Sequence, residues 1–171
     1  MYTKYLVTGA TGFLGRTLVR KLTERGFTVS ALVMKSDPLI HSLPDGISVF
    51  YGDITDRGSL DEAFQNTGRE YCVIHCAGMI SIASSPDKSI YRINVQGTEN
   101  IISLCRLHNV GKLIYVSSVH SIPEKPKGEI ITETYDFSPD TVKGDYAKSK
   151  AMATNAVLDA AGHGINASIV H

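Results

Sequence analysis

Short apolar runs rich in β-branched residues alternate along this chain with longer amphipathic stretches. Runs of about four to eight such residues are typical of strands buried in a parallel sheet, whereas a repeat near 3.6 residues is typical of helices. The runs that predict strands are residues 5–8, 28–33, 47–51, 71–75, 112–117 and 165–170. The stretches that predict helices are residues 12–24, 59–66, 90–108 and 145–161.

This alternation predicts right-handed βαβ crossovers, and therefore a parallel sheet with helices on both faces. Six strands in this arrangement indicate a doubly wound α/β (Rossmann) fold with strand order 3-2-1-4-5-6. Such sheets bind ligands in a crevice at the carboxyl ends of their strands. We expect an irregular crossover at residues 35–46, which contain two prolines, and a long polar loop over the crevice at residues 121–143. Gly26 and Gly162 are expected to end the first and last helices.

The composition is that of one domain, residues 1–171, with 43% hydrophobic and 20% charged residues. Seventeen basic residues balance seventeen acidic ones, so the formal net charge is +0. Nucleic-acid binding driven by overall charge is therefore disfavoured. No apolar run is long enough to span a bilayer and the first residues lack a signal-peptide pattern, which favours a cytoplasmic protein. Cys72, Cys76 and Cys105 lack zinc-ligand spacing, so no metal site is expected and the thiols are interpreted as small buried apolar groups.

The strongest chemical signal is the motif TGATGFLG, which directly follows the first predicted strand and opens the first helix. Gly9 permits a tight turn, Gly12 lets the backbone approach a pyrophosphate, and Gly15 allows close packing of helix on strand. The helix N-terminus offers unpaired N–H groups to phosphates. A Walker A loop would need Gly in place of Ala10 and Lys in place of Arg16, so that alternative fails.

The glycine spacing is GxxGxxG, and the motif resembles that of the short-chain dehydrogenase/reductase superfamily. The resemblance is to its extended branch of nucleotide-sugar epimerases, dehydratases and dihydroflavonol-reductase-like enzymes. Other segments resemble this family in the same order along almost the whole chain: YGDITD at 51–56, HCAG at 75–78, NVQGT at 94–98, YVSS at 115–118 and YAKSK at 146–150. The resemblance implies an NAD(P)-dependent oxidoreductase or epimerase that transfers hydride at a carbonyl or alcohol carbon.

The YxxxK pair places Tyr146 and Lys150 on one helix face, where a nearby ammonium favours the phenolate form. The resemblance implies that Tyr146 is the general acid/base and that Lys150 tunes it and holds the nicotinamide ribose. It also implies that Ser118 hydrogen-bonds the substrate oxygen and that Asn94 supports the catalytic group. Ser117 is the alternative to Ser118, because alternation along a strand sends the two to opposite faces.

The cofactor is expected to be NADP or NAD, and the end of the second predicted strand bears on the choice. An acid there would bind the ribose 2′-hydroxyl of NAD, and a basic residue would accommodate the 2′-phosphate of NADP. Val33 occupies the family's acidic position and Lys35 follows, which favours NADP; Asp37 is interpreted as a turn residue. Met34 stands where dihydroflavonol-reductase-like members usually have Arg. The residues expected to bind the cofactor are Gly9, Thr11, Gly12, Phe13, Leu14, Gly15, Lys35, Asp53, Ile54, Ala77, Gly78, Tyr146 and Lys150.

Members of the extended branch continue beyond the sixth strand into a C-terminal substrate lobe, so the chain is expected to be an N-terminal Rossmann portion that is inactive alone. The substrate would be a small carbonyl or alcohol compound: a nucleotide sugar, a dihydroflavonol or a sterol-like ketone. The resemblance also implies a homodimer through the helices at 90–108 and 145–161. A non-catalytic dinucleotide-sensing module is the alternative function, although family members of that kind typically lack the Tyr/Lys pair.

Overall fold

The computed structural model describes residues 2–81 and 88–171. It contains one six-stranded sheet in the order β3-β2-β1-β4-β5-β6, and every pair of neighbouring strands is parallel. The doubly wound order predicted from the sequence is therefore confirmed. The strands are β1 (Lys4–Thr8), β2 (Thr28–Val33), β3 (Ser48–Tyr51), β4 (Tyr71–His75), β5 (Lys112–Val116) and β6 (Ala167–Val170).

Helical segments connect these strands. The α-helical ones are α1 (Phe13–Glu24), α2 (Asp61–Phe64), α3 (Ser89–Tyr91), α4 (Gly97–Leu107) and α5 (Asp145–Gly162). Single 3-10 turns are η1 (Ile40–Ser42), η2 (Arg57–Leu60) and η4 (Val119–Ser121), and η3 (Arg92–Gln96) is π-helical. Since η1 is the one helical turn between β2 and β3, the irregular crossover predicted there is confirmed.

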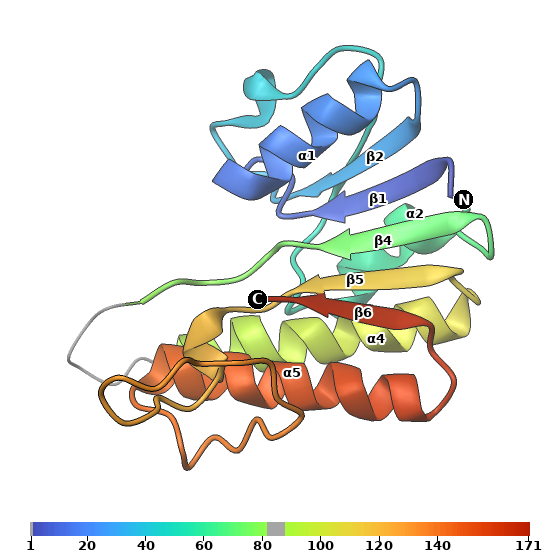
Figure 1. The fold of residues 1–171 in the computed structure, drawn as a ribbon. Coiled ribbons are helices and arrows are strands. Elements are labelled where there is room, and N and C mark those ends of the chain that lie inside the picture. The colour runs from blue at the N-terminus through green and yellow to red at the C-terminus, as the bar shows by residue number, and fades with distance from the viewer. Residues whose placement is uncertain (1, 82–87) are drawn as a thin grey trace.

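The sheet separates two apolar layers because successive residues of a strand point to opposite faces. Leu6 of β1 belongs to the larger core, which also contains residues of α2, α4 and α5. Its neighbour Val7 belongs to the second core, together with Val19 of α1. Figure 1 shows the same arrangement, with α1 on one side of the sheet and α4 and α5 on the other.

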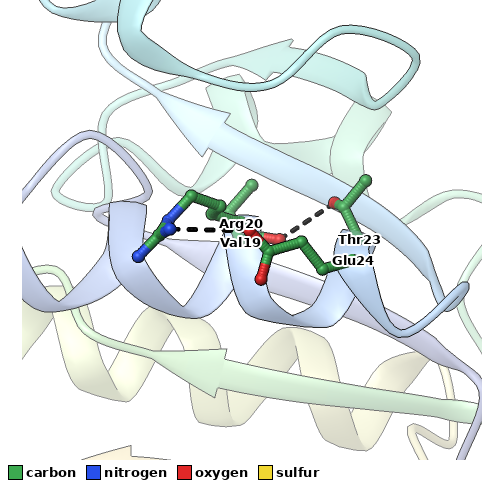
Figure 2. A network of polar contacts seen from close by, with 4 residues as sticks. All are labelled: Val19, Arg20, Thr23 and Glu24. Atoms are coloured by element: carbon green, nitrogen blue, oxygen red, sulfur yellow. Dashed lines mark hydrogen bonds and ion pairs between the residues drawn. The ribbon is translucent and has the colours of Figure 1, made fainter.

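Helix α1 keeps a polar outer surface. Arg20 and Glu24 form an exposed ion pair at 3.5 Å one turn apart, and the Thr23 hydroxyl donates to the Val19 carbonyl at 2.9 Å (Figure 2). Exposed pairs of this spacing contribute only about 0.3–0.5 kcal/mol. The helix is therefore held mainly by its apolar face, on which Val19 is fully buried.

Two helices, α1 and α5, are each followed by a glycine whose backbone φ is positive. Gly26 has a φ of +77° directly after the Arg25 cap, as predicted. The prediction for the last helix was wrong, because Gly162 is still helical and Gly164 adopts the left-handed conformation with a φ of +94°. The local pattern of small residues continues through Gly162, so it carried no signal for the later position.

The predicted loop at residues 121–143 lacks regular structure beyond the turn at its start, but it does not lie free over the crevice. Phe137 and Val142 are buried, and they form a small core with Ala147 and Ala151 of α5. The loop therefore packs against α5, along the lower edge of the molecule in Figure 1.

Candidate functional site

The segments that carry the predicted site residues converge at one edge of the sheet. In Figure 1 the arrowheads of β1, β4, β5 and β6 point to the same side, where α1 begins and the chain leaves β4 and β5. The first half of α5 reaches this edge too, since Lys150 donates a hydrogen bond to the Val116 carbonyl at 2.8 Å. The topology thus assembles the glycine turn and the YxxxK segment at one edge from positions far apart in the sequence.

The turn between β1 and α1 needs glycine at two positions for different reasons. Gly9 has a φ of +61°, a conformation that side-chain-bearing residues rarely adopt. At Gly15 a Cβ would lie 2.1 Å from the Gly9 carbonyl oxygen, so α1 could not pack this close to the turn. Gly12 is different, because a Cβ there would meet only the Gly9 oxygen, at 3.2 Å, and the residue is exposed.

The start of α1 is suited to an anion. Gly12 caps the helix without a side-chain hydrogen bond, and the first turn has no acidic residue. The N–H groups of that turn and the positive end of the helix dipole therefore face outward. Phe13 and Leu14 follow on the surface, with 87% and 43% of their area exposed.

A buried histidine links β1, β4 and the helix of the NVQGT segment. The Thr98 hydroxyl donates to the Asn94 carbonyl at 2.6 Å, so it accepts from the His75 Nε2–H at 3.1 Å. His75 Nδ1 then accepts from the Thr8 hydroxyl at 2.7 Å, and the Thr8 oxygen accepts the Ala77 N–H at 3.2 Å. The neutral histidine thereby fixes the turn that follows β4.

The stability of the fold is expected to fall as the pH drops below 6.5. Burial lowers the pKa of His75 from 6.5 to about 3, and the Lys150 charge adds to this effect. Between these values the unfolded chain binds a proton that the folded chain rejects, so stability is lost on acidification by about 1.4 kcal/mol per pH unit at most. Urea unfolding of wild type and His75→Gln at several pH values measures this. The exposed His41→Gln variant is the control, and equal pH dependence in wild type and His75→Gln would contradict the assignment.

Asn94 is 2% exposed, and its side chain positions other groups instead of facing the crevice. Its Oδ1 accepts the Met79 N–H at 2.7 Å, and its Nδ2 donates to the Met79 carbonyl at 2.9 Å and to the Ser149 hydroxyl at 3.0 Å. It lies in the π-helical turn η3, a distortion frequent at functional sites. The Asn94 side chain thus ties the turn after β4 to α5.

The two serines after β5 have different surroundings. Ser117 is buried, and its hydroxyl contacts the hydroxyls of Thr154 at 2.6 Å and Ser121 at 3.3 Å. Ser118 is partly exposed, and its Oγ accepts the His120 N–H at 3.2 Å. Because a hydroxyl carries one hydrogen as well as its acceptor sites, Ser118 can still donate to a ligand.

Lys150 is a buried cation, with 6% of its area exposed. In addition to its bond to Val116, its Nζ lies 4.5 Å from the centre of the Tyr115 ring. Burial lowers the pKa of Lys150 from 10.5 to about 8. Tyr146, four residues earlier, is partly exposed, and its ring meets the His120 ring edge-on at 6.0 Å.

Two further predicted cofactor residues, Lys35 and Asp53, lie beside the ends of β2 and β3. A cavity of about 540 Å³ is lined there by Met34, Lys35, Ser36, Tyr51, Gly52, Asp53 and Ser59. The Asp53 carboxylate accepts the Thr55 N–H at 2.8 Å, which shapes one wall. Ile54, by contrast, belongs to the core, and a Cβ on Gly97 would lie 2.7 Å from its Cδ1.

Three contacts at this edge were not predicted from the sequence. The Asp37 carboxylate accepts a hydrogen bond from the Thr11 hydroxyl, inside the glycine motif. Ser149 joins Asn94 to α5. His120, in the turn η4, packs against Tyr146. Each of these contacts joins segments that are distant in the sequence. The NVQGT motif, which contains Asn94, was therefore the one local signal that pointed to any of them.

The three thiols behave as buried groups, although Cys76 keeps some exposure. Burial raises the pKa of Cys72 and of Cys76 to about 11 and that of Cys105 to about 12, so all three stay protonated at neutral pH.

Across residues 2–81 and 88–171, no group of three or more His, Cys, Asp or Glu side chains is arranged to hold a metal ion. None of the helices in these ranges has the length and apolar character required to cross a membrane.

Comparison with known proteins gives a consistent match. The sequence fits the model of the 3-beta hydroxysteroid dehydrogenase/isomerase family over residues 6–169. "Sterol demethylase protein B" of Methylococcus capsulatus is 33% identical over 97% of this chain and 49% of that protein. A "Putative dihydroflavonol 4-reductase" of Synechocystis sp. is 34% identical over 98% of this chain and 48% of that protein. The chain thus spans about half the length of the curated relatives it matches.

Solved structures show the same relationship. A UDP-glucose 4-epimerase of Thermus thermophilus in complex with NAD superposes with a TM-score of 0.83 at 29% identity. The match covers 97% of this chain and 53% of the epimerase. The structure named gox2253 superposes with a TM-score of 0.86 at 30% identity and covers 99% of this chain and 51% of that one.

Proposed function

Because the chain belongs to the 3-beta hydroxysteroid dehydrogenase/isomerase family, we propose that it binds NAD(P) and takes part in hydride transfer at a carbonyl or alcohol carbon. The observation that carries this proposal is the shared sheet edge, which bears the glycine turn after β1, Ser118 after β5 and the YxxxK segment of α5. The likeness to an epimerase in complex with NAD supports it.

The glycine turn fits the pyrophosphate of a dinucleotide. Gly9 and Gly15 make a tight turn that a Cβ would break, while Gly12 leaves the helix start open to a ligand. The cavity at the ends of β2 and β3 has a mostly apolar surface, as an adenine site requires, although Lys35, Asp53 and two serines also line it. The nicotinamide half would then extend toward Ala77 and Gly78 and the exposed side of Tyr146.

When bound, the nicotinamide ring accepts or supplies the hydride. Tyr146 would pass a proton to or from the substrate oxygen as general acid/base. Lys150, one helical turn after Tyr146 in α5, would tune the tyrosine and hold the ribose. Ser118 would donate its remaining hydrogen to the substrate oxygen, and Asn94 would keep the turn after β4 in place. These residue roles are proposals that rest on the family resemblance and on the placement of the residues.

Two exposed apolar side chains favour a sterol-like or other apolar substrate over a nucleotide sugar. Ile80 follows β4 with 75% of its area exposed, and Val119 follows β5 with 61% exposed. Both leave the sheet at its carboxyl edge, where substrate would meet the cofactor. Exposed apolar groups at a site of this kind gain by contact with an apolar ligand.

An enzyme assay tests this proposal. Purified protein is incubated with NAD or NADP and either a 3β-hydroxysteroid, a dihydroflavonol or a UDP-hexose, and reduction of the cofactor or conversion of the sugar is followed. Because the chain spans half the length of its relatives, the assay uses the complete gene product. We expect oxidation of the apolar alcohol. Binding of dinucleotide without turnover of any substrate class would instead support the alternative of a dinucleotide-sensing module.

A homodimer through α4 and α5 stays a prediction. A hollow of about 650 Å³ lies between these helices, and the exposed Met152 is among the residues that line it. Light scattering of the purified protein, with Met152→Glu as the variant, tests whether two copies associate through this surface.

A further inference from the structure

The ammonium of Lys150 is buried without an acid to balance its charge. Only 6% of the residue is exposed, and no carboxylate in the described part of the chain forms an ion pair with it. One of its N–H groups donates to the Val116 carbonyl at 2.8 Å. A single hydrogen bond to a neutral acceptor offsets little of the hydration that a buried cation loses. The other groups around the ammonium therefore decide whether it stays charged.

The ring of Tyr115 in β5 is one of these groups. Lys150 Nζ lies 4.5 Å from the centre of this ring, within the distance of about 6 Å at which the face of an aromatic ring attracts a cation. Tyr115 is 1% exposed, and the attraction is largest where water is excluded. The His75 ring stacks on Tyr115 at 5.7 Å, which fixes the tyrosine from β4.

The hydroxyl of Tyr115 does not explain why a tyrosine is buried here. It has no hydrogen-bond partner among the residues that the structure describes. The Thr98 hydroxyl, on the same side of the sheet, already donates to the Asn94 carbonyl and accepts from His75. Burial also raises the pKa of Tyr115 well above its usual value, so the side chain stays neutral. What it offers Lys150 is therefore the face of its ring.

The titratable groups that face Lys150 from β4 and the turn after it are also neutral at pH 7. Burial lowers the pKa of His75 to about 3, and burial raises the pKa of the Cys76 thiol to about 11. Tyr146 lies one turn earlier on the same helix. Burial lowers the pKa of Lys150 itself to about 8, and attraction to a ring face acts in the opposite direction.

We propose that Tyr115 is a positioning residue for Lys150, whose ammonium its buried ring keeps charged and fixed at the carboxyl edge of the sheet. The inference rests on the proposed function, in which Lys150 holds the nicotinamide ribose. Because Tyr115 and Val116 are neighbours in β5, one strand fixes the ammonium by a ring face and by a carbonyl. The N–H groups that do not bind Val116 are left for a ligand.

The direct test is a pH titration of Lys150, followed by NMR of protein that carries carbon-13 at the lysine Cε atoms. Loss of one resonance in Lys150→Met assigns the signal. We expect a pKa near 8 in wild type. Tyr115→Leu should lower this pKa by about one pH unit, the size that a buried cation–π contact supports. Tyr115→Phe keeps the ring face and should leave the pKa of Lys150 unchanged.

Two further proteins separate the ring face from packing. Pentafluorophenylalanine in place of Tyr115 keeps the size of the ring and inverts the charge distribution of its face, so it should lower the pKa of Lys150 as leucine does. Tyr71→Leu is the matched control, because Lys4 lies 5.5 Å from the centre of that ring but is exposed to solvent. It should leave the Lys150 titration unchanged. Melting temperatures establish that each protein folds.

The functional readout is the affinity of the complete gene product for NADH as a function of pH. Lys150 loses its charge as the pH rises through its pKa. The pH at which affinity falls should therefore move down by about one unit in Tyr115→Leu and stay in place in Tyr115→Phe. Weaker NADH binding of equal size at every pH would reduce Tyr115 to a packing role and contradict the proposal.

The NMR titration decides the inference independently of the cofactor. An unchanged pKa of Lys150 in both Tyr115→Leu and the pentafluorophenylalanine protein would overturn it. An equal fall in Tyr115→Phe would also overturn it, because the effect would then belong to the hydroxyl. If the pKa falls as expected but folded wild type binds no dinucleotide, the proposed function is wrong and the contact between ring and ammonium stands.

Discussion

Replacing Tyr146 with phenylalanine is expected to lower kcat by about 10²- to 10⁴-fold, because general acid/base catalysis typically contributes this much. The ring would keep its packing against His120, so the Kd for NADH should stay within about twofold. The measurement is steady-state turnover of the complete gene product with the apolar alcohol, together with a separate binding titration. Tyr135→Phe, at a tyrosine with 91% of its area exposed, is the matched control.

The neighbouring histidine offers the alternative explanation. His120 is exposed, and its ring lies 6.0 Å from that of Tyr146. If Tyr146→Phe retains turnover within about threefold and His120→Gln loses it, the proton passes through the histidine and the tyrosine assignment is wrong. If both variants lose turnover while binding is kept, the pH dependence of kcat in His120→Gln separates a positioning role from direct proton transfer.

Two substitutions in the glycine turn should act on different properties: one on the stability of the fold and the other on dinucleotide binding. Gly15→Ala is expected to lower the free energy of unfolding by about 3 kcal/mol, as overpacked sites do, and the melting temperature by about 6–12 °C. The cause is that its Cβ would lie 2.1 Å from the Gly9 carbonyl oxygen, a backbone atom that cannot move aside alone. Thermal and urea unfolding give both values.

Gly12→Ala should leave the fold nearly intact and impair binding. Its φ of -62° suits any residue, and loss of a glycine N-cap costs at most about 1 kcal/mol. The added methyl group would nevertheless occupy the approach to the helix start, so we expect NADH binding to weaken at least about tenfold. Gly162→Ala, a helical position with open space around it, is the control and should stabilise α5 slightly. Equal NADH affinity in wild type and Gly12→Ala would contradict the proposal that the start of α1 binds the dinucleotide.

The sheet order and the placement of the glycine turn were predictable because they depend on local patterns. Apolar alternation marks strands, and GxxGxxG at the first strand-to-helix junction has few alternative meanings. The same alternation separates Ser117 from Ser118, and the structure gives the two serines different environments. Local sequence therefore carried the fold and the position of the glycine turn at the first strand-to-helix junction.

The contacts that complete the site were not predictable, since they depend on tertiary approach. Asp37 and Thr11 are 26 residues apart, and only the pairing of β1 with β2 brings their segments together. The π-helical turn around Asn94 likewise depends on Met79 and Ser149, which lie on other segments. Local propensity at Asn94 predicts an uninterrupted helix, and tertiary hydrogen bonds override it.

Calorimetric titration of this 171-residue chain with NADH tests most directly whether the edge at Gly9–Gly15 is a dinucleotide site. The chain contains no tryptophan, so circular dichroism is used to establish that the sample is folded. We predict saturable binding to one site per chain, weakened at least about tenfold in Gly12→Ala. A folded sample that binds neither NADH nor NADPH would contradict the assignment of this edge as a dinucleotide site.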